Sequence, residues 1–168
     1  DMAHEPRRAV AHSNVLYLLN HDVLVDARHS FAEHLDFGTQ FEKLLQSEWQ
    51  PHTNVKDPTR RLQIGFVSGD LNHHALANFL EPLFKGLAQK QSLALHAYYT
   101  NTPEDEVTRR MRTYFAHWHA VADSSDHELS LQMRADGIDI LFDLSGHTRK
   151  NRLLTFARKP APLQVSWL

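Results

Sequence analysis

Apolar and polar positions change their spacing after the first third of the chain. Over residues 1–48 the apolar residues recur at helical intervals, in runs broken at Asn20–Asp22 and at Gly38. Residues 49–60 contain two prolines and several polar residues, a composition typical of a linker. The sequence therefore predicts a helical lead-in and a linker over residues 1–60. The apolar faces expected on the helices comprise Ala9, Val10, Val15, Leu16, Leu18 and Leu19, and then Val25, Ala27, Phe31, Ala32, His34 and Leu35.

From Arg61 onward, short apolar runs alternate with stretches of helical periodicity. Strands are predicted over residues 62–68, 93–100, 117–121, 138–144 and 163–167. Helices are predicted over residues 73–89, 104–116, 126–136 and 150–158. Strict alternation with short connections favours an α/β fold, in which a Rossmann-like parallel sheet carries helices on both faces.

Two helix boundaries have local signals. Thr102-Pro103 forms an acceptable cap and first-turn pair, and acidic residues follow it from Glu104, where the helix dipole favours them. We therefore expect a helix to begin there. Gly137 is expected to end the helix over residues 126–136.

A polar turn follows the first predicted strand and contains Ser68, Asp70, Asn72 and His74. Open α/β sheets place ligands at the carboxyl ends of their strands, next to helix N-termini. This turn is therefore a candidate binding site. The alternative is that Asp70 or Asn72 only caps the helix that follows.

A second polar turn, Asp143–Thr148, follows a very apolar strand and leads into the basic segment Arg149–Arg152. Both turns should lie at the same edge of a parallel sheet, because the carboxyl ends of its strands meet there. Histidine, threonine and arginine in one crevice favour an anion or sugar-phosphate site. The alternative is that the basic residues, Lys150 above all, are solvated first-turn side chains.

Composition excludes several classes of protein. The 168 residues suffice for one domain, and the formal net charge of −2 gives no broad basic surface for nucleic acid. The absence of cysteine excludes disulfides and thiolate metal sites and favours a reducing compartment. No apolar run is long enough for a membrane span and no signal peptide is visible, so we expect a cytoplasmic protein without a membrane partner.

Common catalytic motifs are missing. The sequence contains no GxxxxGK[ST] loop, no GxGxxG after the first strand, no HExxH and no GxSxG. The 13 histidines suggest metal binding or proton transfer, although most could lie on the surface. His117 and His119 alternate on a weak strand and could share a face with a carboxylate from elsewhere. We expect no metal and no other cofactor.

Three segments resemble a known family in order and spacing. They read VSGDLNHHALANFLEPLF, HAYYTN and DGIDILFDLSGHTRKNRLLTFARKPAPLQVSWL. They are similar to the amino-terminal catalytic lobe of the O-linked N-acetylglucosamine transferases, glycosyltransferase family 41. The likeness covers residues 10–168, and the GHTRKNR form is closest to bacterial and plant-type members. We expect a bacterial homologue.

The resemblance implies one lobe of a two-lobe GT-B fold. Residues 61–168 would form the Rossmann-like lobe, and residues 1–60 would join it to tetratricopeptide repeats. A carboxyl-terminal lobe beyond Leu168 would supply most of the nucleotide contacts, so we expect this fragment alone to be inactive. The family's metal-independent reaction inverts the sugar and transfers N-acetylglucosamine from UDP-GlcNAc to Ser or Thr of proteins. Protein O-fucosylation from GDP-fucose and a non-catalytic peptide-binding scaffold are the alternatives.

The resemblance also implies site residues. His12, Asp70 and His74 match catalytic positions of the family, and which histidine is the base stays open. An imidazole with a pKa near neutral suits removal of a hydroxyl proton. Alternatively, His74 only bonds sugar or phosphate oxygens and His12 makes a structural bond between lobes. Substrate or donor contacts are expected from Asn72, His147, Thr148, Arg152 and Leu168, with Trp167 beside Leu168 at the floor of the cleft. Asn78 stands where animal members have a second histidine, which leaves any role for it in doubt.

Overall fold

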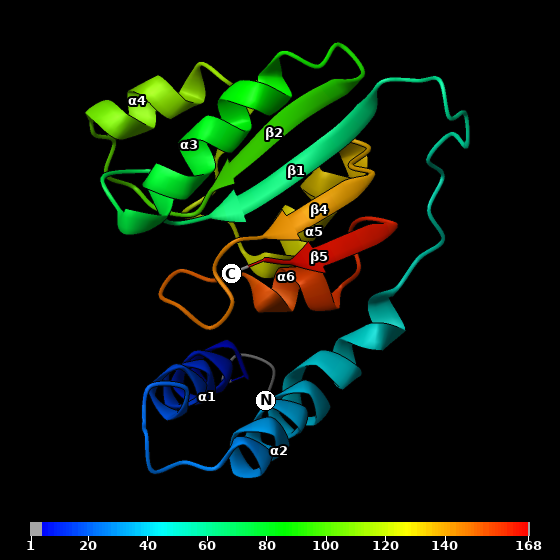
Figure 1. Cartoon of the computed structure of the whole chain (residues 1–168). Coiled ribbons are helices and arrows are strands. Elements are labelled where there is room, and N and C mark those ends of the chain that lie inside the picture. The colour runs from blue at the N-terminus through cyan, green and yellow to red at the C-terminus, as the bar shows by residue number, and fades with distance from the viewer. Residues whose placement is uncertain (1–4, 168) are drawn as a thin grey trace.

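A parallel β-sheet forms the centre of the computed structural model, which describes residues 5–167 (Figure 1). Within that range the strand order is β3-β2-β1-β4-β5. The strands are β1 Leu62–Ser68, β2 Leu93–Tyr99, β3 His117–Ala120, β4 Ile140–Asp143 and β5 Leu163–Ser166. Every pairing is parallel, so all carboxyl ends lie at one edge, as the sequence predicted.

Helices cover both faces of this sheet, which confirms the predicted Rossmann-like arrangement (Figure 1). They are α3 Ala75–Ala88 and α4 Glu106–Arg112 on one face, and α5 Asp126–Ala135 and α6 Leu153–Ala157 on the other. Because side chains alternate along a strand, Phe66 packs beneath Phe84 of α3, whereas Val67 joins the core under Leu129 of α5. The polar turns are therefore carried by strands held on both sides.

The helix after β1 is capped differently from the expectation. His74 is the N-cap residue of α3, and its Nδ1 accepts the backbone N–H of Leu76 at 3.2 Å. The side-chain amide of Asn72 instead donates to the carbonyl of Gly69 and to the hydroxyl of Tyr99. The prediction that Asp70 or Asn72 caps this helix is therefore wrong.

Two other helix starts also differ. Asp105 caps α4 through a capping box with Thr108, so the helix begins at Glu106 and the expected start after Thr102-Pro103 is wrong. Helix α6 begins three residues later than predicted. Lys150 has a φ of 67°, outside the right-handed helical region, so the helix cannot begin at residue 150 as predicted. Gly137, with a φ of 66°, follows α5 as expected.

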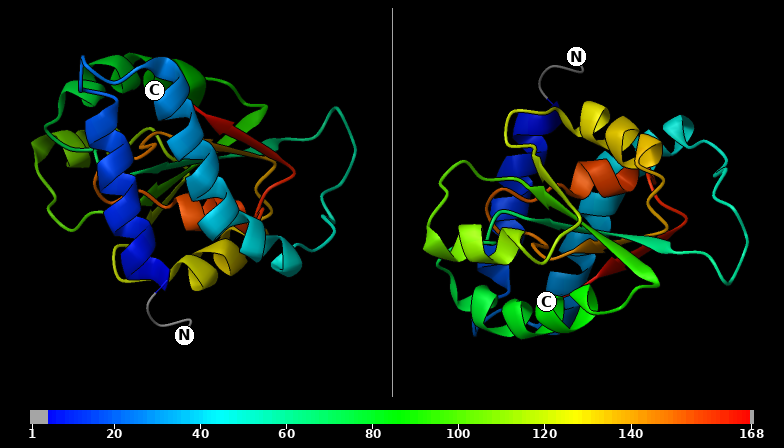
Figure 2. Two further views of the ribbon diagram at one scale, coloured as in Figure 1. Left: turned by 90° about the horizontal axis from the view of Figure 1, so that it is seen from below. Right: turned by 90° about the horizontal axis from the view of Figure 1, so that it is seen from above.

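The lead-in consists of two helices that lie side by side beneath the sheet (Figure 2). They are α1 Glu5–Leu19 and α2 Ala27–Phe37, and α2 continues into the π-helix Gly38–Glu42 and the 3-10 helix Lys43–Glu48. The run predicted to break at Gly38 does end there as an α-helix, since Gly38 is the C-cap residue of α2, but its backbone keeps right-handed helical angles of φ −57° and ψ −41° and the chain stays helical.

The lead-in helices bury a narrow seam rather than the broad faces expected. Ala9 and Leu16 of α1 pack with Phe37 and Phe41, and the partly buried Leu153 and Leu154 extend this cluster to α6. Val10, Val15, Leu18, Phe31 and Leu35 are instead exposed. None of the helices described in residues 5–167 has the length and apolar character needed to cross a membrane.

Residues 49–60 run along the side of the lobe and are fixed to it (Figure 1). The carboxylate of Asp139, only 7% exposed, accepts hydrogen bonds from Asn54 at 2.6 Å and from Arg60 at 2.5 and 2.7 Å. The backbone N–H of Gln63 donates to the same carboxylate. The predicted linker is thus an ordered strap at the amino end of β4.

Candidate functional site

A cavity of about 1120 Å³ opens at the carboxyl edge of the sheet, between the strand-end turns and α1. The predicted site residues among its lining are Asp70, His74, His147, Thr148 and Arg152. The structure thus brings the turns after β1 and β4 together, although more than seventy residues separate them in the sequence.

The turn after β1 presents one acidic and one imidazole side chain. The buried hydroxyl of Ser68 accepts the N–H of Asp70 at 3.0 Å, which fixes the start of the turn. His74 is exposed, and because its Nδ1 accepts the N–H of Leu76, its neutral ring carries the proton on Nε2. In this tautomer His74 can donate a hydrogen bond to a ligand oxygen.

The turn after β4 is held by hydrogen bonds to the buried carboxylate of Asp143. Asp143 is 2% exposed, and its carboxylate accepts the N–H groups of Ser145 and Gly146 at 3.0 and 3.1 Å. Burial raises the pKa of the Asp143 carboxyl, and these two bonds oppose that rise. The hydroxyl of Thr148 donates to the carbonyl of Ser145 at 2.8 Å. His147 and Thr148 are therefore held by a turn with its own hydrogen-bond network.

His147 contacts the lead-in helices. Its Nδ1 lies 2.8 Å from the hydroxyl of Ser13, and its ring packs edge-on against Phe37 and His34. Burial, followed by the charges of His34 and His12, lowers the pKa of His147 to about 4. The ring is therefore a neutral hydrogen-bonding group at neutral pH.

His12 is not among the residues that line the cavity. Its side chain is 16% exposed, and its ring packs edge-on against Phe37 and Phe41 in the seam between helices. Its Nε2 lies 3.7 Å from a carboxylate oxygen of Glu33. The catalytic role that the resemblance implies for His12 stays a prediction.

Arg152 lines the cavity, but its guanidinium is used within the protein. It donates to the carbonyls of Val121, Ala122 and Ser124 at 2.8–3.1 Å and lies 3.6 Å from the carboxylate of Asp126. It therefore holds the turn between β3 and α5. The other cationic side chains in the lining are Arg149, Lys150 and Arg158.

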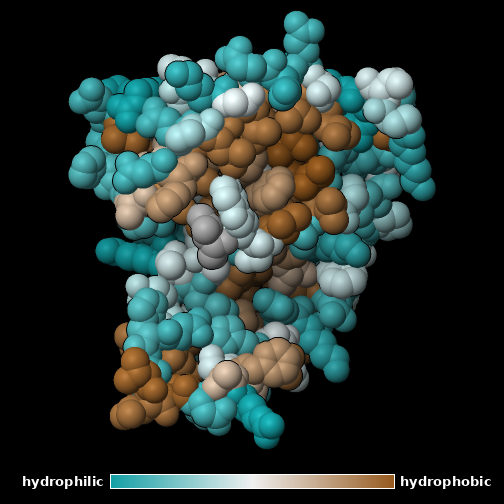
Figure 3. Space-filling view, viewed as in Figure 1, coloured by the Kyte–Doolittle hydropathy of each residue, from teal (hydrophilic) through white to brown (hydrophobic). Residues whose placement is uncertain are grey.

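Three remaining predicted residues lie elsewhere or outside the described range. Asn72 braces its turn through Gly69 and Tyr99 and is not among the lining residues. Trp167 lines a separate apolar groove on the α3 face of the sheet, seen as an apolar band in Figure 3. Trp167 is therefore not part of the cavity lining, and its expected place at the floor of a two-lobe cleft stays a prediction. Leu168 falls outside the described residues.

Sequence reasoning missed two parts of the lining. One is the face of α1 with Val10, Asn14 and Tyr17, and the other is the start of α5 with Ser125 and Asp126. The second had a signal, since the polar segment Asp123–Asp126 follows a predicted strand just as the other two turns do. The first had no signal in the local pattern, and only the resemblance, through His12, pointed to this helix.

Comparisons with known proteins agree on one family. Residues 6–168 match the family model described as Glycosyl transferase family 41. An Arabidopsis thaliana protein named "Probable UDP-N-acetylglucosamine--peptide N-acetylglucosaminyltransferase SPINDLY" is 32% identical over 143 residues, which cover 82% of this chain and 15% of that protein. The similarly named SEC protein of the same plant is 30% identical over 110 residues, covering 65% of this chain and 11% of its own length.

A solved structure shows the same fold. A mutant of the Thermobaculum terrenum O-GlcNAc transferase superposes with a TM-score of 0.87 and 38% sequence identity, covering 98% of this chain and 31% of that one. The chain spans about 15% of the length of the SPINDLY relative. Because the family model matches nearly all of it, the chain belongs to glycosyl transferase family 41.

Proposed function

We propose that this chain is the amino-terminal lobe of an inverting glycosyltransferase that moves N-acetylglucosamine from UDP-GlcNAc to Ser or Thr hydroxyls of proteins. The observation that carries the proposal is the meeting of Asp70 and His74 with His147 and Thr148 around one cavity. Family membership and the names of the relatives support the same reaction.

The hydrogen-bond pattern suggests how the work is divided. Nδ1 of His74 caps α3, so the ring would have to give up that bond before this nitrogen could accept a proton. Donation from Nε2 to a sugar or phosphate oxygen leaves the cap bond between Nδ1 and Leu76 intact. Asp70 supplies the acceptor in the same turn, suited to sugar hydroxyls or to an amide of the protein substrate. His12 would act through the neighbouring His147 as a positioning residue.

Charge in the cavity suits a nucleotide diphosphate. Arg149 and Lys150 line it, and cations at the leaving group stabilise the negative charge that develops there. Arg158 also lines the cavity, but its guanidinium is paired with Glu48. We propose that a carboxyl-terminal lobe supplies the remaining nucleotide contacts and that tetratricopeptide repeats precede α1. Within this proposal the reaction needs no metal and takes place in the cytoplasm.

Calorimetric titration of the full-length protein tests the donor. We expect saturable heat with UDP-GlcNAc, no heat with GDP-fucose, and no transfer by residues 1–168 alone. Heat with GDP-fucose in place of UDP-GlcNAc would assign a fucosyltransferase instead. Binding of peptides without either sugar nucleotide would make the chain a scaffold and overturn the proposal.

A further inference from the structure

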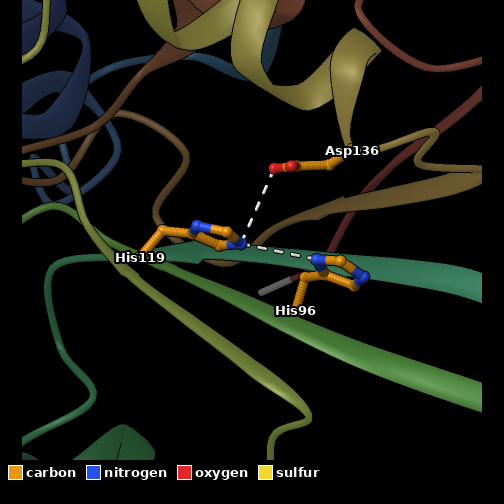
Figure 4. A group of neighbouring side chains, drawn as sticks. All are labelled: His96, His119 and Asp136. Carbon is orange, nitrogen blue, oxygen red and sulfur yellow. Dashed lines mark hydrogen bonds and ion pairs between the residues drawn. The ribbon is translucent and has the colours of Figure 1, made fainter.

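A second cluster of chemically active side chains lies on the α5 face of the sheet, apart from the cavity. His96 on β2 and His119 on β3 point toward Asp136, the C-cap residue of α5 (Figure 4). In the register of the two strands His119 pairs with Tyr98, so the two histidines are diagonal neighbours on one face. Within residues 5–167 this is the one group of three potential metal ligands that lies close enough to share an ion.

The cluster is distinct from the proposed active site. His96 and His119 lie within β2 and β3, and Asp136 follows the last residue of α5, so none of the three belongs to the strand-end turns after β1 and β4. The lining of the cavity, by contrast, follows the carboxyl ends of the strands, and none of His96, His119 and Asp136 belongs to it. A ligand bound by this cluster would therefore be independent of the proposed transferase chemistry.

Distances within the cluster fit a tetrahedral cation. Nδ1 of His96 and Nε2 of His119 lie 3.4 Å apart, and the latter lies 3.6 Å from Oδ2 of Asp136. Zn–N and Zn–O bonds of about 2.0–2.1 Å place neighbouring ligand atoms about 3.3 Å apart on a tetrahedron. All three ligand atoms lie within 4.8 Å of one another, so a small adjustment closes the third edge.

These same contacts are poor hydrogen bonds, because both exceed the usual range for an N–H donor. Without a cation the lone pair of His96 Nδ1 has only the long contact with His119.

Each ligand is also oriented by a second contact. Nε2 of His96 donates to the side-chain oxygen of Gln63 at 2.8 Å, which leaves the lone pair of Nδ1 facing the cluster. Nδ1 of His119 lies 2.9 Å from the side-chain amide of Gln132, which can turn to accept its N–H and free Nε2 for a metal. The hydroxyl of Tyr98 donates to Oδ2 of Asp136 at 2.7 Å. Metal-binding histidines and carboxylates in proteins are held by such outer contacts.

The charges and burial around the three side chains also bear on cation binding. His96 is 4% exposed, and burial, followed by His117, lowers its pKa to about 4. Burial is also the main cause that lowers the pKa of His119. A metal ion binds an imidazole in its neutral form. The negative end of the α5 dipole and the charge of Asp136 favour a cation here, whereas the nearby Arg61 opposes it.

We propose that His96, His119 and Asp136 bind one divalent transition-metal ion, with Zn²⁺ the best match to two imidazoles and one carboxylate. Water completes the tetrahedron, since the ring of His117 stacks on His96 with centroids 4.3 Å apart and so does not face the ion. The ion would tie the short edge strand β3 to β2 and to α5. Its role is structural rather than catalytic.

Titration calorimetry of the metal-stripped 168-residue chain with Zn²⁺ tests the site. We expect one ion per chain and a higher melting temperature with Zn²⁺, because an ion that binds only the folded state stabilises it. His119→Ala and the isosteric Asp136→Asn should each weaken binding by at least about tenfold. His117→Ala is the matched control on the same strand and should bind as the wild type does.

Cobalt gives an independent readout of the geometry. Co²⁺ in the wild-type chain should show the intense visible absorption of a tetrahedral site, and His119→Ala should lose it. Melting of the variants without metal verifies that they fold. Equal Zn²⁺ binding by wild type, His119→Ala and Asp136→Asn would show adventitious binding to other histidines and overturn the proposal, as would the absence of a saturable site.

Discussion

The hydroxyl of Ser13 lies 2.8 Å from Nδ1 of His147, and this contact joins α1 to the turn after β4 across 134 residues of sequence. Asn151 donates to the same hydroxyl oxygen at 3.1 Å, so the proton of Ser13 is free to point at the imidazole. The neutral ring of His147 then keeps its own proton on Nε2. One hydrogen-bond chain thus positions the lead-in helices against the wall of the cavity.

Ser13→Ala should separate the lead-in from the lobe without disturbing the sheet. Ser13 is 2% exposed. The change removes the hydroxyl that bonds Nδ1 of His147 and the amide of Asn151, so each of these two groups loses one hydrogen-bond partner. We expect a loss of about 1–3 kcal/mol in the free energy of unfolding, measured by urea denaturation. Ser47→Ala, which removes only a local bond to Leu44, should change it by less than about 0.5 kcal/mol. Equal effects of the two changes would contradict the role given to Ser13.

Stability should depend on pH through His147. Its pKa is about 4 in the folded chain and about 6.5 in an unfolded one. Above the higher value both states are neutral, so the group contributes no pH dependence there. As the pH falls from 6.5 toward 4 the unfolded chain takes up the proton first, so His147 makes folding less stable by up to about 1.4 kcal/mol per pH unit.

Urea unfolding at neutral pH and at about pH 5 checks this, with His147→Gln for comparison. The variant should lose less stability than the wild type between the two conditions. The same pH dependence in both proteins would show that His147 titrates alike in the folded and unfolded chains.

His74 and its neighbour His73 form a matched pair for testing the turn after β1. Both are exposed, but only His74 lines the cavity. In the full-length protein, His74→Asn keeps a capping residue for α3 and should still lower sugar transfer by about 10²-fold or more. His73→Asn should leave it near the wild-type rate. If His74→Asn retains full activity, the ring does no more than cap the helix.

The alternation of strands and helices was predictable because each local pattern agrees with the global fold. The strands around Phe66, Ala97 and Leu141 are buried runs, and Gly137 ends α5 with the backbone conformation that glycine favours. Exact caps were not predictable, since acceptable capping residues compete. His74 caps α3 instead of Asn72, because the side-chain amide of Asn72 donates to the carbonyl of Gly69 and to the hydroxyl of Tyr99. Tyr99 is distant in the sequence, so no local pattern shows this contact.

The candidate site was predictable only in part. That Asp70 and His147 share one sheet edge follows from parallel topology, and the lining of the cavity bears this out. The contact between Ser13 and His147, and that between Arg60 and Asp139, depend on how distant segments dock, which no local pattern encodes. The sequence suggested only that His117 and His119 could share a face with a carboxylate, and no metal was expected. The grouping of His119 with His96 and Asp136 followed only from strand register and from the end of α5.

Removing the cation from the buried pair Arg60–Asp139 should loosen the strap. Asp139 lies under the surface, and although burial works against its ionisation, hydrogen bonds from Arg60, Gln63 and Asn54 lower its pKa. Arg60→Ala leaves this charge without its cation and should cost about 3 kcal/mol in the free energy of unfolding. Limited proteolysis should then cut within residues 49–60.

Arg61→Ala is the control for this change. Its guanidinium bonds only the carbonyl of Leu93 among the described residues, so its loss should cost about 1 kcal/mol. Similar losses from both arginine variants, or an uncut strap in Arg60→Ala, would contradict the account of Asp139.

The most direct test of the proposed active site is sugar transfer from UDP-GlcNAc to a Ser/Thr peptide by the full-length protein, followed by mass spectrometry. Asp70→Asn preserves the shape of the turn but removes the charge that lines the cavity, whereas Asn78→Ala alters an exposed residue of α3 outside the lining. We predict transfer by the wild type and by Asn78→Ala, and a loss of about 10²-fold or more in Asp70→Asn. Undiminished transfer by Asp70→Asn, or none by the wild type, would contradict the account.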